Sequence, residues 1–313
     1  MCADHGDPRE VAAAIRAQLP MTPGTLTSTM SRADHRVGLF LRELTRNGVR
    51  PLPGFSASTH PQLISADSLH GGDHATIGAA FGWLIRLQLV DQPQLIEAQI
   101  GRDLLPPHIQ ITLWKLDRWI NSRRELTEPR DLERVAIVLA WCEQLFRAGP
   151  AALLPCPLLH LRADAGPADL LDLVPDPLVD QLAQLGTLAA TELLAPFSAA
   201  RRVRLGCPLG RQPIAADADM VVEDVLLELK CTQGVIRAAG RTFCLGVDLI
   251  RQLLGYLLLD REDDLGAQSV GVYAARFGLL WTMPADELIT AVSGRPGDLT
   301  AWREAFGMLW NTA

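Results

Sequence analysis

The stretch Ala215–Thr232, which reads AADADMVVEDVLLELKCT, groups its apolar residues into two short runs of the kind that form β-strands. The acidic pair Glu223-Asp224 separates the runs and is expected to form a tight turn between antiparallel strands. Because side chains alternate between the two faces of a strand, Glu228 and Lys230 are expected on one face and their leucine neighbours on the other. The stretch therefore predicts a β-hairpin with charged groups on one face.

A candidate metal site follows from this hairpin. Asp219 stands at the end of the first strand, and folding back of the second strand would bring its carboxylate close to that of Glu228. Two converging carboxylates repel each other unless a hard cation binds them through oxygen ligands. We expect Asp219, Glu228 and the carbonyl oxygen of Leu229 to hold Mg²⁺ or Mn²⁺, which can activate water and neutralise charge on a phosphate.

The lysine of this stretch is unusual in the composition of the chain. Of the 29 basic residues, only Lys115 and Lys230 are lysines, and all the others are arginines. Lysine can shift its pKa and orient water, whereas arginine stays charged and presents a larger planar group. The position of Lys230 therefore favours a catalytic role over a solvated ion pair with Glu228 on a surface hairpin.

This stretch resembles the PD-(D/E)XK nuclease superfamily, whose signature is an acid, a short spacer and then (D/E)-x-K on the next strand. Asp219, Glu228 and Lys230 match the signature, while Ala218 replaces the proline that precedes the first acid. The resemblance implies an α/β (α+β) fold, with a restriction-endonuclease-like core in which helices flank a small mixed sheet. It also implies metal-dependent hydrolysis of DNA phosphodiester bonds, with RNA still open, in phage defence or DNA repair.

The helix predicted over residues 247–259 extends the resemblance to the RecB-like branch. It carries Gln252 and Tyr256 four residues apart, hence on one face, as in the Q-x-x-x-Y motif of that branch. The resemblance implies that this face lies beside the active site and touches nucleic acid. We expect Gln252 and Arg251 to lie beside the carboxylates.

A loop is expected between the predicted strand and this helix. Residues 233–242 contain glycines together with Arg237 and Arg241. Arginines on a loop above the site could contact the phosphates of a bound strand.

Two segments are alternatives for the first helix of the core. Residues 76–89 contain Gly78-Ala-Ala-Phe-Gly82, which looks like the G-T-A-x-H helix of RecB-like nucleases, with Gly82 in place of the metal-binding histidine. Residues 178–195 are the other alternative, and there Glu192 could supply a third carboxylate.

The change in residue pattern along the chain predicts three regions. Their ranges are 1–165, a mainly helical accessory region; 178–283, the nuclease-like core; and 284–313, a helical tail. Strands are expected at 202–207, 214–222, 225–232 and 269–273, with 279–282 as a further partner and little strand before residue 200.

The composition limits the protein class. Hydrophobic residues make up 48% and charged residues 21%, which excludes wholesale disorder. A net charge of −7 argues against coating nucleic acid over the whole surface. No apolar run approaches the ~18 residues of a membrane span, and no secretory signal is visible, so the cytoplasm is expected. The six cysteines form no C-x-x-C pair and none follows Cys244, so neither a zinc module nor an iron–sulfur cluster is expected.

A second function remains open at this point. The chain could be a catalytically idle nuclease-fold subunit that binds nucleic acid or acts as a scaffold in a larger complex. The intact set Asp219, Glu228 and Lys230 favours the enzyme, whereas Gly82 and the acidic surface favour the idle subunit. A protein partner that binds the helical first half is a further possibility.

Overall fold

The computed structural model describes residues 7–19, 21–30, 32–47, 52, 55, 61–122, 125–209, 214–237 and 240–310. The main helices are α1 (Pro8–Gln18), α2 (Leu26–Thr29), α3 (Arg36–Leu44), α4 (Asp73–Leu89), α5 (Ile96–Arg102), α6 (Pro107–Ser122), α7 (Asp131–Ala148), α8 (Pro167–Asp172), α9 (Asp176–Ala189), α10 (Val247–Leu259), α11 (Ala285–Ser293) and α12 (Leu299–Gly307). The strands are β1 (Gly24–Thr25), β2 (Val203–Leu209), β3 (Ile214–Val222), β4 (Val225–Lys230), β5 (Val235–Arg237), β6 (Gly240–Thr242), β7 (Ser269–Ala274) and β8 (Leu279–Pro284).

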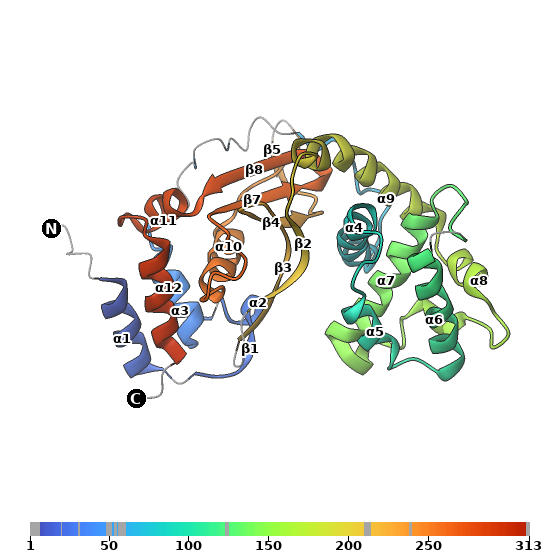
Figure 1. The fold of residues 1–313 in the computed structure, drawn as a ribbon, viewed down its shortest axis with the longest axis horizontal. Coiled ribbons are helices and arrows are strands. Elements are labelled where there is room, and N and C mark those ends of the chain that lie inside the picture. Colours follow the sequence, from blue (N-terminus) through green and yellow to red (C-terminus); the bar gives the residue numbers. More distant parts are fainter. Residues whose placement is uncertain are drawn as a thin grey trace.

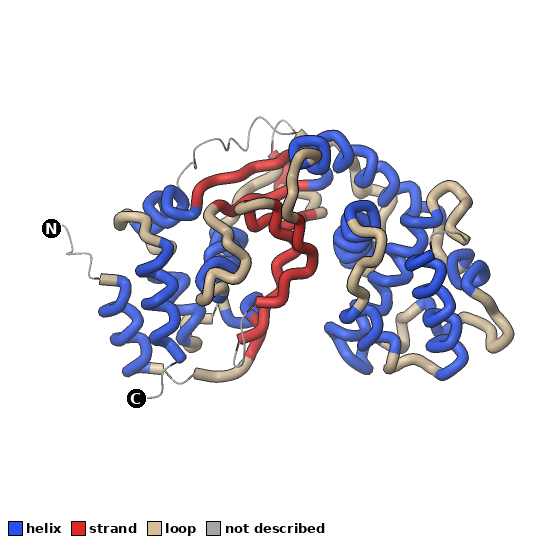
Figure 2. Tube along the Cα trace, in the orientation of Figure 1, coloured by secondary structure: helices blue, strands red, loops and turns tan. Residues whose placement is uncertain are grey.

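The fold is mixed α/β and has two lobes (Figure 1). One lobe contains the larger sheet with α10 and the helices at the two ends of the described chain, and the other is built from α4 to α9. Figure 2 shows that the strands gather in the first lobe. Among the described residues, only the two-residue β1 precedes residue 200 as a strand, so the expectation of a mainly helical first half is confirmed.

The larger sheet is mixed. Its strand order is β1-β3-β4-β7-β8, and β2 also pairs with β3. Strand β3 is antiparallel to β2 and β4, β4 is parallel to β7, and β7 is antiparallel to β8. A parallel pair needs a crossover connection, and here α10 lies within it. The predicted mixed sheet flanked by helices is therefore present.

The predicted turn is a two-residue hairpin. Val222 pairs directly with Val225, so Glu223 and Asp224 form the loop between β3 and β4. Glu223 has a φ of 53°, in the left-handed region that tight hairpin turns favour.

The two faces of the sheet belong to two hydrophobic cores. Leu226 packs with α3, α10 and α12, whereas Leu227 on the opposite face packs with α4, α7 and α9. On the second face, the ring of Phe81 stacks on the ring of Tyr273, with the two ring centroids 6.1 Å apart. The helix α10 has the bounds predicted for it, and its Ile250 and Leu254 are fully buried.

The segment over residues 233–242 differs from the expectation. It was predicted as a loop, but β5 and β6 pair antiparallel in a separate two-stranded sheet, and Pro61 bridges to Thr242. The apolar residues Val235 and Ile236 are exposed on this hairpin, so hydrophobic periodicity gives no signal for it. Across the described residues, no helix combines the length and the apolar character needed to span a membrane.

Candidate functional site

The centre of the site is a network between β4 and α10. Glu228 is only 5% exposed, and its Oε1 atom accepts a hydrogen bond from Lys230 Nζ at 2.5 Å. Gln252 binds both residues, because its Oε1 accepts from Lys230 Nζ at 3.2 Å and its Nε2 donates to Glu228 Oε1 at 3.1 Å. The Gln252 Nε2 group also donates to the Tyr256 hydroxyl at 2.6 Å. The structure thus brings together four of the residues selected from the sequence.

Asp219 joins this network from the neighbouring strand. The last paired residues of β3 and β4 are Met220 and Leu227, and Asp219 and Glu228 are the next residues where this pairing ends, close enough for the charge of Asp219 to raise the pKa of Glu228. Beyond that point the N–H of Leu229 donates to Asp219 Oδ2 at 2.7 Å. A strand end supplies backbone N–H groups that no neighbouring strand uses, and here one of them orients the carboxylate.

Burial dominates the electrostatics of the two carboxylates. It raises the pKa of Asp219, and burial together with the nearby charge of Asp219 raises the pKa of Glu228 to about 7. Burial lowers the pKa of Lys230, but the ion pair with Glu228 outweighs it and the net pKa lies above the usual value. Lys230 is therefore an ammonium ion at neutral pH, suited to donate hydrogen bonds and to balance negative charge.

The residues of the site fit a hard divalent cation. Glu228 Oε2 is buried and has no hydrogen-bond partner among the described residues, which is costly for a carboxylate oxygen unless another group binds it. No group of three or more His, Cys, Asp or Glu side chains in the described part of the chain could hold a metal. Mg²⁺ binds through one or two carboxylates and retains several waters, so Asp219, Glu228 and the Leu229 carbonyl are a suitable set. Zinc would call for His or Cys ligands.

Two of the predicted residues lie elsewhere. Arg251 was expected beside the carboxylates, but its Nε donates to Thr45 Oγ1 at 3.0 Å and its Nη1 to Asp248 at 3.2 Å. Consecutive helix residues are about 100° apart around the axis, so Arg251 faces α3 while Gln252 faces β4. Glu192 is exposed in a π-helical turn (Ala190–Leu194), away from the strand and the helix that form the network, and a third carboxylate from it stays a prediction.

The remaining predicted residues have defined places but untested roles. Arg241 lies half-buried on β6, where its carbonyl accepts from the N–H of Gln62 at 3.1 Å. Arg237 ends β5, and its side chain lies outside the described part of the structure. Gly82 lies in α4, with open space where a side chain would begin.

Sequence reasoning missed several charged residues near Asp219. The guanidinium carbon of Arg86, on α4, lies 4.7 Å from the centroid of the Trp83 ring. The positive charge of Arg86 lowers the pKa of Asp219, but burial raises this pKa by more. Glu143 accepts from Trp83 Nε1 at 2.7 Å and pairs with Arg147 at 2.6 Å. One signal was available, because Arg86 is the single charged residue in the mostly apolar second half of α4.

Comparison of the sequence with models of known protein families gives no match, and comparison with curated proteins gives none either.

The raised pKa of Glu228 predicts a pH dependence of stability in the metal-free protein. Its folded pKa of about 7 exceeds the ordinary value of 4.5, so the folded state binds more protons than the unfolded state between these values. Stability should therefore fall as pH rises from about 5 to about 8. At 1.36 kcal/mol per pKa unit, this one group accounts for at most about 3 kcal/mol.

The matched measurement is urea unfolding of the wild-type protein and Glu228→Gln in EDTA across this pH range. The variant cannot ionise, so its free energy of unfolding should fall less with pH and should exceed that of the wild type at the alkaline end. If the free energy of unfolding changed equally with pH in the two proteins, Glu228 would have an ordinary pKa in the folded state.

Proposed function

We propose that this chain is a divalent-metal-dependent nuclease of PD-(D/E)XK type, similar to the RecB-like branch, that hydrolyses DNA phosphodiester bonds. The observation that carries the proposal is the buried network in which Lys230 and Gln252 bind Glu228, with Asp219 held by the Leu229 N–H where the β3–β4 pairing ends. The mixed sheet and the helix that follows the E-x-K strand support a restriction-endonuclease-like core. DNA is the proposed substrate, the cytoplasm the proposed location, and phage defence or DNA repair the proposed role.

Each residue of the network has a distinct task in this proposal. A bound Mg²⁺ or Mn²⁺ would supply an activated water and neutralise charge on the scissile phosphate. The carboxylates of Asp219 and Glu228 would hold the ion, and the Leu229 N–H keeps Asp219 in place. The ammonium group of Lys230 donates hydrogen bonds and balances the charge that develops on the phosphate. Gln252 fixes Lys230 and Glu228 relative to each other.

The idle-subunit function has one observation in its favour. Lys230 already binds Glu228 Oε1, so the charge of Glu228 is partly balanced without a metal. In that case the fold would bind nucleic acid, or a protein through the helical lobe, without cleaving it.

A cleavage assay separates the two functions. The full-length protein is incubated with supercoiled plasmid, linear duplex and single-stranded DNA in Mg²⁺, in Mn²⁺ and in EDTA. The nuclease predicts products in at least one metal and none in EDTA. Binding without cleavage in every metal would favour the idle subunit, and cleavage that persists in EDTA would contradict a metal-dependent mechanism.

A further inference from the structure

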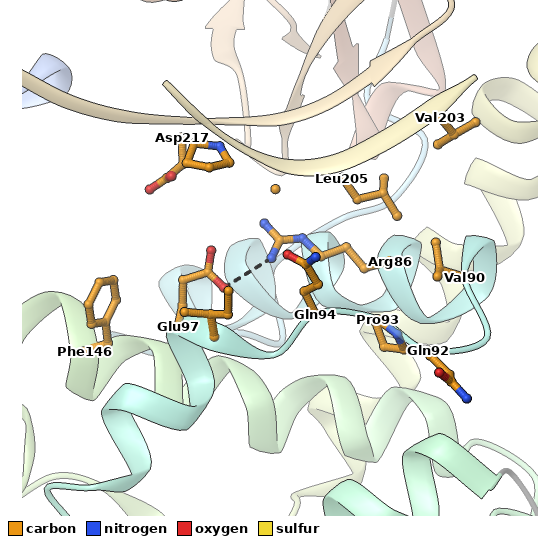
Figure 3. Close-up of a pocket in the computed structure, with 13 residues that line it drawn as sticks. Arg86, Val90, Gln92, Pro93, Gln94, Glu97, Phe146, Val203, Leu205 and Asp217 are labelled. Atoms are coloured by element: carbon orange, nitrogen blue, oxygen red, sulfur yellow. Dashed lines mark ion pairs between the residues drawn. The ribbon is translucent and has the colours of Figure 1, made fainter. Parts of the chain in front are cut away.

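A cleft with a volume of about 390 Å³ lies between the helical lobe and the sheet. In Figure 3 its upper wall comes from β2 and β3, and its lower wall from α4, α5 and α7. The volume lies within the range of about 300–1,000 Å³ that small-ligand pockets occupy. Its lining includes Arg86, Gln94, Glu97, Phe146, Val203 and Asp217.

The walls of the cleft carry exposed apolar side chains. Four of the fourteen large exposed hydrophobic residues in the described chain line this cleft: Val90, Ile96, Phe146 and Val203. Phe146 is 39% exposed, although α7, on which it lies, is otherwise largely buried. Exposed apolar side chains gathered in a concave site indicate a ligand with apolar faces.

The polar groups of the cleft disfavour a phosphate as its occupant. The charged lining residues are Arg86, Glu97 and Asp217, which together carry one net negative charge. Arg86 is already engaged, because its Nη1 lies 3.6 Å from Glu97 Oε2 and Gly206 leaves just enough room for its guanidinium group. Carboxylates and the Gln94 amide suit instead a neutral ligand edge with N–H donors and acceptors.

The cleft lies near Asp219, one of the two carboxylates of the proposed active site. Asp217 precedes Asp219 by two residues on β3, a rise of about 6–7 Å along a strand. The charge of Arg86 acts on both of these carboxylates. A group bound in the cleft would therefore lie near Asp219, on the face of the sheet opposite to α10.

We propose that this cleft binds an unpaired nucleobase of the substrate strand, a proposal that rests on the nuclease function above. The base stacks on Phe146 and against the apolar walls, and its edge bonds to Glu97, Asp217 and Gln94. A base in a duplex uses that edge for its partner and both faces for stacking, so the cleft selects single-stranded or flipped-out nucleotides.

The first test measures binding without cleavage. Fluorescence anisotropy in EDTA gives the affinity of the full chain for a labelled single-stranded oligodeoxynucleotide. Phe146→Ala should weaken binding roughly 5- to 100-fold, which is the usual loss of affinity when one base-stacking aromatic side chain is replaced by alanine. Gln94→Ala, on an exposed loop, should weaken it less. Ile111→Ala is the matched control, because Ile111 is 56% exposed on α6 and does not line the cleft, and it should leave the affinity unchanged.

A second test identifies the group that enters the cleft. An oligonucleotide with one 5-iodouracil should cross-link to Phe146 on irradiation, and an oligonucleotide of abasic sites should bind as weakly to the wild type as to Phe146→Ala. Equal affinity of Phe146→Ala and the wild type, or cross-links only outside the cleft, would overturn the proposal and leave a protein segment as the alternative occupant. No measurable DNA binding by the wild type would overturn it as well. Base-dependent binding without cleavage would overturn only the nuclease function.

Discussion

Replacement of Asp219 by asparagine or Glu228 by glutamine is expected to abolish metal-dependent DNA cleavage, with kcat lowered on the order of 10³-fold or more. Both substitutions keep nearly the same shape and remove one negative charge. Glu228→Gln is the more informative of the two, because Glu228 Oε2 is buried and has no hydrogen-bond partner among the described residues, so we expect this oxygen to bind the ion. Titration calorimetry with Mn²⁺ should show metal binding lost together with cleavage.

Glu192→Gln is the matched control for this prediction. It removes the same charge from an exposed carboxylate in the π-helical turn, outside the hydrogen-bonded network around Glu228. Its cleavage and metal binding should equal those of the wild type. A Glu228→Gln protein that still cleaves DNA would remove this carboxylate from the mechanism, and a strong effect of Glu192→Gln would restore it as the third ligand.

The centre of the site was predictable because short-range rules govern it. Two apolar runs separated by Glu223-Asp224 specify a hairpin, and strand alternation then places Glu228 and Lys230 on one face. The spacing of Gln252 and Tyr256 places both on one helix face, whatever that face packs against. Each of these inferences needs only residues within a few positions of one another.

Other features depend on tertiary contacts that local pattern does not encode. The direction of Arg251 is set by Thr45, which is distant in sequence and lies at the end of α3. The cleft combines Arg86, Phe146 and Asp217 from three separate elements, and no periodicity relates them. Only Arg86, the single charged residue in the mostly apolar second half of α4, marked one of these positions in the sequence.

The second large effect is expected at Lys230. Its ammonium group lies between Glu228 Oε1, at 2.5 Å, and Gln252 Oε1, at 3.2 Å, and its side chain is 26% exposed. Lys230→Ala should leave metal binding nearly intact and slow single-turnover cleavage about 10²-fold or more, the usual scale for one electrostatic or proton-transfer group. The metal-binding measurement separates this effect from loss of the ion.

Lys230→Arg is the sharper variant, because it keeps the charge and changes the shape. A planar guanidinium group with a fork of donors does not fit the place of a compact ammonium ion between Glu228 and Gln252, so both hydrogen bonds must rearrange. We expect cleavage by Lys230→Arg to be about as slow as that by Lys230→Ala. Lys115→Arg, an exposed change at the other lysine of the chain, should cleave at the parental rate. Parental activity in Lys230→Arg would mean that positive charge alone matters at this position, and the scarcity of lysine in this arginine-rich chain would then carry no functional meaning.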